Sequence, residues 1–349
     1  MSVDVPVDAL RAFVADLFAA AGLSAPLAAR VASALVEADM SGRSSHGVLQ
    51  AENYLARLET GAMTTAETPV VVRDSGGVIV LDAAHMQGHI AAEEAMALAI
   101  RRARLTGIAA VAVRRGFHTG VVGRYVRMAA EAGCVGIAIS NAKPVMPAPG
   151  GAERLVGTNP LAIGLPQAEG PAIVLDMATT AGTIGRIRQA MAAGNSIPEG
   201  WAVDAKGRPT TDAATAMKGL LLPAGGAKGF GLAFMIDLLA GLLSGGVWGA
   251  ALGELNDDPK NPYNSSYLFI VLHIAHFQPL ADFQAQAAEA ARRLRGSRRA
   301  PGVDRLFTPG EQSAEALATN RGTVPLTDTV RKTLAARALR LGVARPDFL

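Results

Sequence analysis

The stretch "AAEEAMALAIRRARLTGIAAVAVRR" (Ala91–Arg115) decides the fold class, because it passes from helical to strand spacing within one segment. Its amphipathic first part predicts a helix that ends at Gly107, and "IAAVAVRR" (Ile108–Arg115) is a short apolar run typical of a strand. The order then repeats, since residues 123–133 predict a helix and Cys134–Ser140 predicts a strand. Alternation of this kind is typical of an α/β body.

Further strand-like segments lie on both sides of this stretch. "PVVVRDSGGVIVLDAA" (69–84) predicts two strands with a turn at Ser75-Gly76-Gly77, and "LAIGLP" (161–166) and "AIVLDMA" (172–178) predict two more. "SYLFIVLHI" (266–274) is a late strand. Together with the alternating helices, these strands imply an α/β body with a sheet that need not be all parallel.

Helical periodicity precedes the strands. Residues 6–40 carry two apolar stripes of helical spacing. "SSHGVLQAENYLARLETG" (44–61) then predicts a short helix, with Ser44 or Ser45 as its cap and Gly61 as its end. The first sixty or so residues are therefore expected to form a small helical lobe.

Length and composition exclude several classes of protein. The chain has 349 residues, of which 50% are apolar and 18% charged, so two or three well-buried lobes are expected and a disordered chain is excluded. The net charge is only +3 and aromatic residues make up 5% of the chain. A nucleic-acid groove needs a basic face with interleaved aromatics, so we expect no nucleic-acid partner.

The sequence favours a cytoplasmic protein. Its single cysteine, Cys134, excludes an internal disulfide, and the first residues lack a basic-then-apolar signal pattern. The most membrane-like segment, residues 229–253, contains Asp237 and several glycines. It is interpreted as a buried helix followed by a Gly-rich turn, so no membrane association is expected.

The chain lacks the usual dinucleotide fingerprint. A G-x-G-x-x-G motif directly after an early strand would place a helix N-terminus against a pyrophosphate, and no segment has that spacing. Residues 225–231 ("GGAKGFG") and 182–186 ("GTIGR") are nevertheless Gly-rich. Such turns can hold phosphate through backbone N–H groups, with Lys228 as a cation, or simply lead into the next helix. An ordinary Rossmann domain is not expected.

Six ordered segments resemble one known family. They are "SSHGVLQAENYLARLETG", "NAKPVMPAPGGAERLVGTNPLAIGLP", "IVLDMATTAGTIGRI", "IPEGWAVDAKGRPTTD", "LLPAGGAKGFGLAFMIDLLAGLLSGG" and "TPGEQSA". Together they resemble the type 2 malate/L-lactate dehydrogenases, also called the L-sulfolactate dehydrogenase-like oxidoreductases. The likeness covers nearly the whole chain, from the first helices to the last.

The resemblance implies a fold and an activity. The fold is α/β but not a Rossmann fold: a helical lobe of residues 1–68 plus 310–349 beside a mixed-sheet body of residues 69–309. Members use NADH or NADPH to interconvert 2-oxo acids and 2-hydroxy acids, and some reduce cyclic imino acids such as Δ1-piperideine-2-carboxylate. A homodimer with its active site near the subunit contact is implied as well. The sequence leaves the choice between NADH and NADPH open.

Carbonyl reduction by hydride transfer needs a proton donor for the developing alkoxide. A histidine suits this step because its pKa is roughly 6.5. His46 matches the proton donor of the family, and Ser45 matches the adjacent serine that orients it. The structural alternative is that Ser45 caps a helix and His46 bonds to nearby backbone.

The resemblance also assigns a cofactor site. The positions that match it lie in five short segments and are His118, Thr119, Gly120, Val121, Val122, Asp176, Met177, Ala178, Ile184, Gly185, Ala227, Lys228, Gly310 and Glu311. Asp176, at a strand end, is of a type that bonds a ribose hydroxyl or caps the next helix.

The substrate site departs from the family at two places. Thr158 matches a position near the substrate carboxylate, where a hydroxyl donates one hydrogen bond or merely serves a turn. Many relatives carry a carboxylate-binding arginine where this chain has Gln50, so Arg43 is a candidate to compensate. The imine reductases carry an acid shortly after the glycine that matches Gly185, whereas this chain has Arg186 and Arg188. That difference favours carbonyl over imine chemistry.

No metal site is expected. His85 and His89 are four residues apart, as two helix-borne ligands would be, but no third ligand accompanies them and a helix start explains them. His273 and His276 lie on or after a strand and are interpreted as packing residues. Three hypotheses remain: a 2-oxo/2-hydroxy acid dehydrogenase, a cyclic imino acid reductase, and a non-catalytic cofactor-binding relative.

Overall fold

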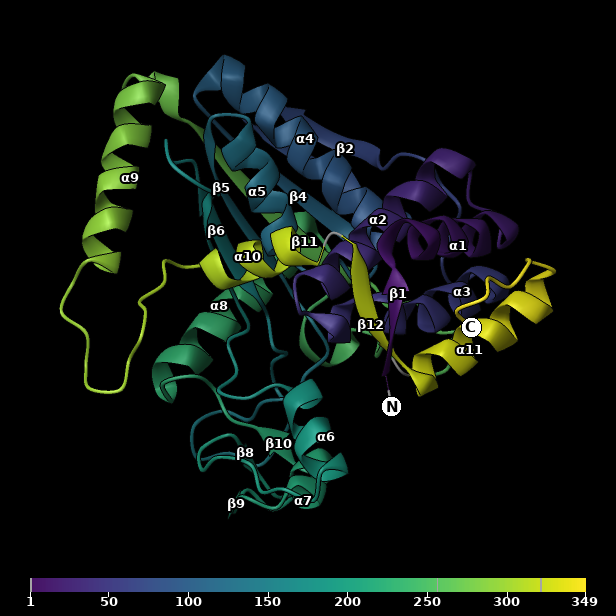
Figure 1. The fold of residues 1–349 in the computed structure, drawn as a ribbon. Helices are drawn as coiled ribbons and strands as arrows, with labels where there is room; N and C mark the ends of the chain where they lie inside the picture. Colours follow the sequence, from purple (N-terminus) through teal and green to yellow (C-terminus); the bar gives the residue numbers. More distant parts are fainter. Residues whose placement is uncertain (1, 256, 321) are drawn as a thin grey trace.

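A central sheet of seven strands organises the molecule (Figure 1). The computed structural model describes residues 2–255, 257–320 and 322–349. In spatial order the strands are β2 (Val70–Ser75), β3 (Val78–Asp82), β4 (Ile108–Gly116), β11 (Ser265–His273), β5 (Cys134–Ser140), β6 (Leu161–Leu165) and β7 (Ile173–Met177). β3 and β4 are parallel, and every other neighbouring pair is antiparallel. The expected mixed sheet is confirmed.

β11 separates two layers of apolar side chains. Alternate residues of a strand point to opposite faces of a sheet. Tyr267, Phe269 and Val271 are buried in the main core, whereas Leu268 packs with Ile236 on the other face. A strand buried on both faces is apolar throughout, which explains the continuous run that the sequence shows here.

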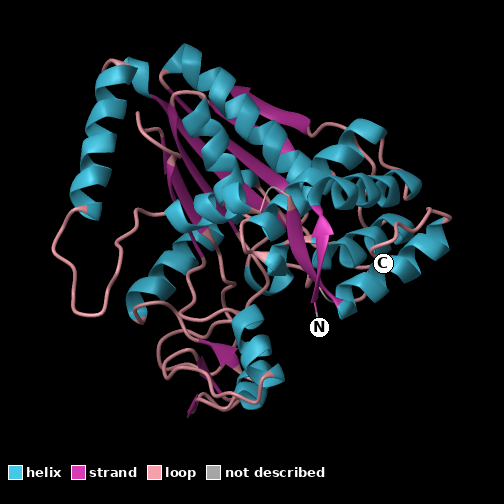
Figure 2. Cartoon of the chain, viewed as in Figure 1, coloured by secondary structure: helices cyan, strands magenta, loops and turns pink. Residues whose placement is uncertain are grey.

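Helices cover both faces of the sheet (Figure 2). α4 (Gly88–Thr106) and α5 (Gly123–Glu131) contact strands β4, β5, β6 and β11 on the side of the main core. α8 (Ala227–Ser244) packs on the opposite side of β4, β5 and β11. The predicted α/β layering is therefore present.

The segment expected to be a buried helix is only partly buried. α8 does form a helix and ends at Gly245, as predicted. However, 39% of its eighteen residues are buried, and large apolar side chains along one side are exposed. Within the described ranges, α8 is the one helix long and apolar enough to cross a bilayer. Periodicity could not reveal this because the helix is apolar on all sides.

The N-terminal helices pack with the C-terminal segment. These elements are α1 (Val7–Ala20), α2 (Ala25–Met40), α3 (Ala51–Thr60) and α11 (Asp328–Leu341). α11 contacts α1 and α3, and strand β1 (Ser2–Pro6) pairs with β12 (Thr323–Thr327). Figure 1 shows both ends of the chain on this side of the molecule.

The start of α3 differs from the prediction. The helix begins at Ala51, after two single 3-10 turns at Ser44–His46 and Val48–Gln50. Neither Ser44 nor Ser45 caps it, because the chain bends at Gly47 between the two turns. The end at Gly61 is confirmed, with a φ of 76° that favours glycine.

A small lobe with its own apolar core follows β7. It contains α6 (Ile184–Ala192), α7 (Ala213–Lys218) and a sheet of β8 (Ala202–Val203), β9 (Pro209–Thr210) and β10 (Leu220–Leu221). Its core joins Ile187 and Ile197 to Met146 and Val156 from the preceding loop. α9 (Leu280–Arg295) and a long loop then lead to α10 (Glu311–Thr319) (Figure 1).

Candidate active site

The turn after α2 presents His46 beside Ser45. The Ser45 hydroxyl lies 2.9 Å from Nδ1 of His46, so one ring nitrogen is already engaged within the turn. Ser45 is exposed and lies against the start of α6, where a Cβ on Gly185 would be 3.5 Å from the Ser45 Cβ. The predicted neighbours Ser45, His46 and Gly185 therefore come together.

A second imidazole faces the first. The rings of His46 and His118 stack with their centroids 5.4 Å apart. Nδ1 of His118 lies 2.6 Å from the hydroxyl of Tyr54, which is buried on α3. Sequence reasoning did not find Tyr54, because a tyrosine on the apolar stripe of a helix gives no signal beyond packing.

Both imidazoles favour their neutral form. Burial lowers the pKa of His46; Asp176 raises it and Arg43 lowers it. Burial lowers the pKa of His118 further, and the neighbouring His46 and His89 add to that effect. Burial also raises the pKa of Tyr54, so this phenol stays protonated. Burial thus disfavours a positive charge on either ring.

A cavity lies near His46, because Arg43 and Asp176, whose charges act on His46, both line it, although neither His46 nor His118 is among its lining residues. It lies between α2, α5, β7 and the start of α10. Its lining includes Arg43, His89, Val121, Gly123, Asp176 and Gly310. A guanidinium nitrogen of Arg43 lies 3.2 Å from a carboxylate oxygen of Asp176. Four predicted site residues from four separate segments meet here: Arg43, Val121, Asp176 and Gly310.

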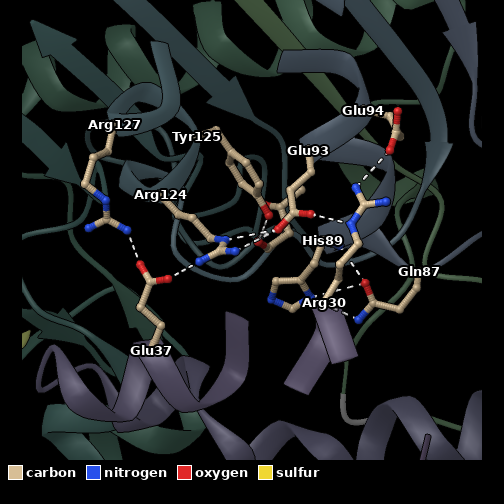
Figure 3. A network of polar contacts seen from close by, with 10 residues as sticks. Arg30, Glu37, Gln87, His89, Glu93, Glu94, Arg124, Tyr125 and Arg127 are labelled. Atoms are coloured by element: carbon tan, nitrogen blue, oxygen red, sulfur yellow. Dashed lines mark hydrogen bonds and ion pairs between the residues drawn. The ribbon is translucent and has the colours of Figure 1, made fainter. Parts of the chain in front are cut away.

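The first turn of α5 is held in place by an ionic network (Figure 3). Arg124 donates to Glu93 at 2.9 Å and pairs with Glu37 of α2, which also pairs with Arg127. Arg30 binds the other oxygen of Glu93 at 2.8 Å. These bonds tie α2, α4 and α5 together on the side of the cavity. Gly123 opens α5 directly against Asp176, where a Cβ would lie 2.9 Å from Oδ2.

His89 has a structural role. It is buried, and its Nδ1 lies 2.9 Å from the side-chain nitrogen of Gln87. Burial lowers its pKa to about 3, so it stays neutral. A Cβ on Gly120 would lie 2.4 Å from the His89 Nε2, which explains glycine at that position together with its φ of 67°. As expected, His89 belongs to the first turn of α4.

The loop before α10 closes one wall of the cavity. Gly310 has a φ of 83° and lies against Val174 of β7, where a Cβ would be 2.6 Å from the carbonyl oxygen. The carboxylate of Glu311 accepts the backbone N–H of Thr308 at 2.8 Å and pairs with Arg305 at 2.6 Å. These bonds lower the pKa of Glu311 to about 2. The side chain of Glu311 therefore stabilises the turn that precedes α10.

Three further predicted residues, Thr158, Ala227 and Lys228, belong to segments that contact Thr179. Thr179, directly after Ala178, binds the loop before Ala227 and Lys228 through a bond from Ala224 N to Thr179 O of 2.9 Å. Thr158 accepts the Thr179 hydroxyl at 2.8 Å. Among the described residues, none of these three belongs to the cavity lining that contains Arg43 and Asp176.

Gln50 braces the turn that carries His46. Its side-chain nitrogen donates to the Ser45 carbonyl at 2.8 Å, and its oxygen accepts from Asn53 at 2.9 Å. Both polar ends of the amide are thus engaged by the protein. Over the described residues, no group of three or more His, Cys, Asp or Glu side chains is arranged to hold a metal ion.

Comparison with known proteins gives a consistent result. Residues 5–335 match the sequence profile of the family described as malate/L-lactate dehydrogenase. The chain is 35% identical to the malate dehydrogenase of Pyrococcus abyssi over 350 residues, which cover 98% of this chain and 96% of that protein. The resemblance predicted from the sequence is confirmed.

Solved structures share the whole fold. Sulfolactate dehydrogenase from Methanocaldococcus jannaschii superposes with a TM-score of 0.93 at 30% identity, covering 98% of each chain. Δ1-Piperideine-2-carboxylate reductase from Pseudomonas syringae superposes with a TM-score of 0.85 at 28% identity. That alignment covers 96% of this chain and 100% of the reductase.

Proposed function

The chain belongs to the malate/L-lactate dehydrogenase family and is an oxidoreductase acting on a CH–OH group. From that premise we propose that it interconverts a 2-oxo acid and a 2-hydroxy acid with NADH or NADPH. The observation that carries the proposal is the stacked pair of His46 and His118 beside the cavity lined by Arg43 and Asp176.

The cavity fits a nucleotide cofactor. The N-termini of α5 and α10 open at its wall, at Gly123 and Gly310, and a helix N-terminus favours phosphate. At both glycines an added Cβ would lie closer than 3 Å to a neighbouring atom, so these two positions of the cavity wall carry no side chain. Val121, Asp176 and Gly310 would hold the cofactor, which supplies or accepts the hydride when bound.

His46 is proposed as the group that moves the proton. With Nδ1 engaged by Ser45, its Nε2 is the nitrogen left to meet the substrate oxygen. Because burial lowers its pKa, the imidazole is mainly neutral near pH 7 and can take the proton of a hydroxy acid. In the reverse direction the imidazolium returns the proton to the oxygen of the carbonyl.

His118 is proposed to hold His46 in place. Its Nδ1 is engaged by Tyr54, and its ring covers one face of the His46 ring. Arg43 and Asp176 set the local charge around the pair. Arg43 lines the cavity and carries a positive charge, whereas Gln50 is engaged by Ser45 and Asn53, so Arg43 is the proposed group for the substrate carboxylate.

Reduction of a cyclic imino acid is the second candidate. It is favoured by the structural likeness to the piperideine-carboxylate reductase. The exposed start of α6 carries Arg186 and Arg188, which bring positive charge to this side of Ser45. A cationic iminium substrate would be repelled there, so carbonyl chemistry is the better fit.

We also propose that the enzyme is a cytoplasmic homodimer. The exposed side of α8 carries Met235, Leu239, Leu242 and Leu243, which repeat at helical spacing. An apolar stripe of this kind marks an interaction site on a protein surface. A second copy of the chain would cover it.

The experiment is a substrate panel with the purified protein and each reduced nicotinamide. Pyruvate, oxaloacetate, sulfopyruvate and Δ1-piperideine-2-carboxylate are supplied separately, and cofactor oxidation is followed by absorbance. The proposal expects turnover of oxo acids. Turnover of the imine alone would establish the second candidate, and cofactor binding without turnover would show a non-catalytic relative.

A further inference from the structure

A buried carboxylate lies under the turn that carries Ser45 and His46. Asp39 belongs to the last turn of α2, and its side chain points into the bend that follows. Only 6% of the residue is exposed. Burial is costly for a carboxylate unless the protein supplies hydrogen bonds, so this position calls for an explanation.

The partners of Asp39 are all in the turn. Its Oδ2 accepts the backbone N–H of Val48 at 2.8 Å, and the Ser44 side chain also donates to it. The backbone closes the same bend, with Arg43 N bonded to Ala38 O at 2.8 Å and His46 N to Arg43 O at 2.8 Å. The chain thus wraps around the carboxylate from Ser44 to Val48.

Gly47 fits against this carboxylate. A Cβ on Gly47 would lie 2.3 Å from Cγ and from both carboxylate oxygens of Asp39. The φ of Gly47 is −88°, which any residue adopts, so close approach rather than backbone conformation requires glycine here. Asp39 and Gly47 therefore define together how closely the turn sits on the end of α2.

We propose that Asp39 is a positioning residue that fixes the turn of Ser44–Val48 and thereby holds the imidazole of His46 in its place against His118. It acts through the Val48 N–H and the Ser44 hydroxyl, on either side of Ser45 and His46. A shift of about 1 Å in a reacting group can cost about a hundredfold in rate. This inference rests on the proposed role of His46.

Asp39→Ala is the first test. It removes both hydrogen bonds and leaves a void beneath Gly47, so kcat should fall about tenfold to a hundredfold. The dissociation constant of NADH or NADPH should stay unchanged, because Asp39 does not line the cavity. Asp39→Asn keeps an oxygen that accepts the Val48 N–H and should restore most of kcat.

Asp82→Asn is the matched control. Asp82 is also buried, at 4% exposure, and accepts a backbone N–H, that of Ala84, at 2.9 Å. This variant should lower the melting temperature without the selective loss of kcat. If Asp39→Ala loses only stability, as Asp82→Asn does, the positioning role is refuted.

Gly47→Ala tests the contact from the other side. Alone it should lower kcat, because the new methyl group meets the Asp39 carboxylate. In the Asp39→Ala background, Gly47→Ala should lower kcat much less, because the carboxylate that the new methyl group meets is absent. Additive losses in the double variant would contradict the proposed contact.

Hydrogen–deuterium exchange separates this inference from the proposed function. Amides of residues 41–50 should exchange faster in Asp39→Ala than in the wild type, and not in Asp82→Asn. Unchanged exchange overturns the positioning role whatever the activity is. Faster exchange together with a fully active His46→Ala variant would support the positioning role and refute the proton-donor role.

Discussion

The imidazoles of His46 and His118 stack at 27°, and a different hydroxyl group holds each of them. Ser45 engages one Nδ1 and Tyr54 the other, so in both rings Nε2 is the nitrogen left for chemistry. The positive charge of either ring lowers the pKa of the other. The two rings are therefore not expected to carry a positive charge at the same time.

Tyr54→Phe should lower kcat about tenfold while the protein stays folded. The change removes the hydroxyl that lies 2.6 Å from His118 Nδ1 and frees that ring to reorient against His46. It also leaves a buried ring nitrogen without its partner, at a cost of about 1–2 kcal/mol. Steady-state kinetics and urea unfolding measure the two effects. An unchanged kcat would show that His118 needs no anchor.

The two directions of the reaction should have opposite pH profiles. Because the pKa of His46 is lowered, hydroxy acid oxidation should be maximal at neutral pH and fall as the pH drops through a value below about 6.5. Oxo acid reduction should fall as the pH rises through the same value. Measuring kcat/KM in both directions checks this.

Charge variants should move that profile with a defined sign. Arg43 lowers the pKa of His46, so Arg43→Gln should shift the profile to higher pH. Asp176 raises it, so Asp176→Asn should shift the profile to lower pH. If both variants shifted the pH profile in the same direction, the titration that sets the profile would not be that of His46.

Arg337→Met should destabilise the protein without affecting kcat. This arginine of α11 is buried and binds Glu59 at 2.6 Å and Glu52 at 3.0 Å, both on α3. Its loss leaves Glu52 without this cation and Glu59 with Arg340 alone, at 3.0 Å. Because Glu52 is partly exposed, the expected cost is about 1–3 kcal/mol. The midpoint of urea unfolding should fall with an unchanged m value. An unchanged midpoint would mean that apolar packing alone holds α11.

The double variant Leu242→Glu/Leu243→Glu should abolish dimerisation. These side chains are 54% and 58% exposed on α8, and charges there would be buried in a dimer. Leu105→Glu, at a residue that is 79% exposed on α4, is the matched control and should leave the mass unchanged. Analytical ultracentrifugation measures the mass of the double variant and of the control. A monomeric wild type would refute the dimer.

Local patterns predicted most elements but not their arrangement. The segment Ala91–Arg115 indicated α4 followed by β4, and Ser75-Gly76-Gly77 indicated the hairpin, because these depend on neighbours in sequence. The insertion of β11 between β4 and β5 was not predictable, since it joins segments that are far apart in the sequence. The pairing of β1 with β12 joins the two ends of the chain, and local sequence patterns could not predict it either.

The site could be predicted only in part. The resemblance identified Asp176, and the departure at Gln50 made Arg43 a candidate; the fold pairs these two residues at 3.2 Å. The resemblance also identified His46 and His118, whose rings stack. Tyr54 and Asp39 escaped notice because each lies in a helix and looks like a packing or capping residue. Their roles depend on contacts across a turn, which periodicity does not encode. The division into residues 1–68 plus 310–349 and 69–309 stays a prediction.

The most direct test of the account is the turnover of His46→Ala with and without added imidazole. The account predicts a loss of about a hundredfold to ten-thousandfold in kcat, an unchanged cofactor dissociation constant, and partial recovery with imidazole. A kcat close to that of the wild type, or a loss and imidazole rescue confined to His118→Ala, would contradict His46 as the proton donor.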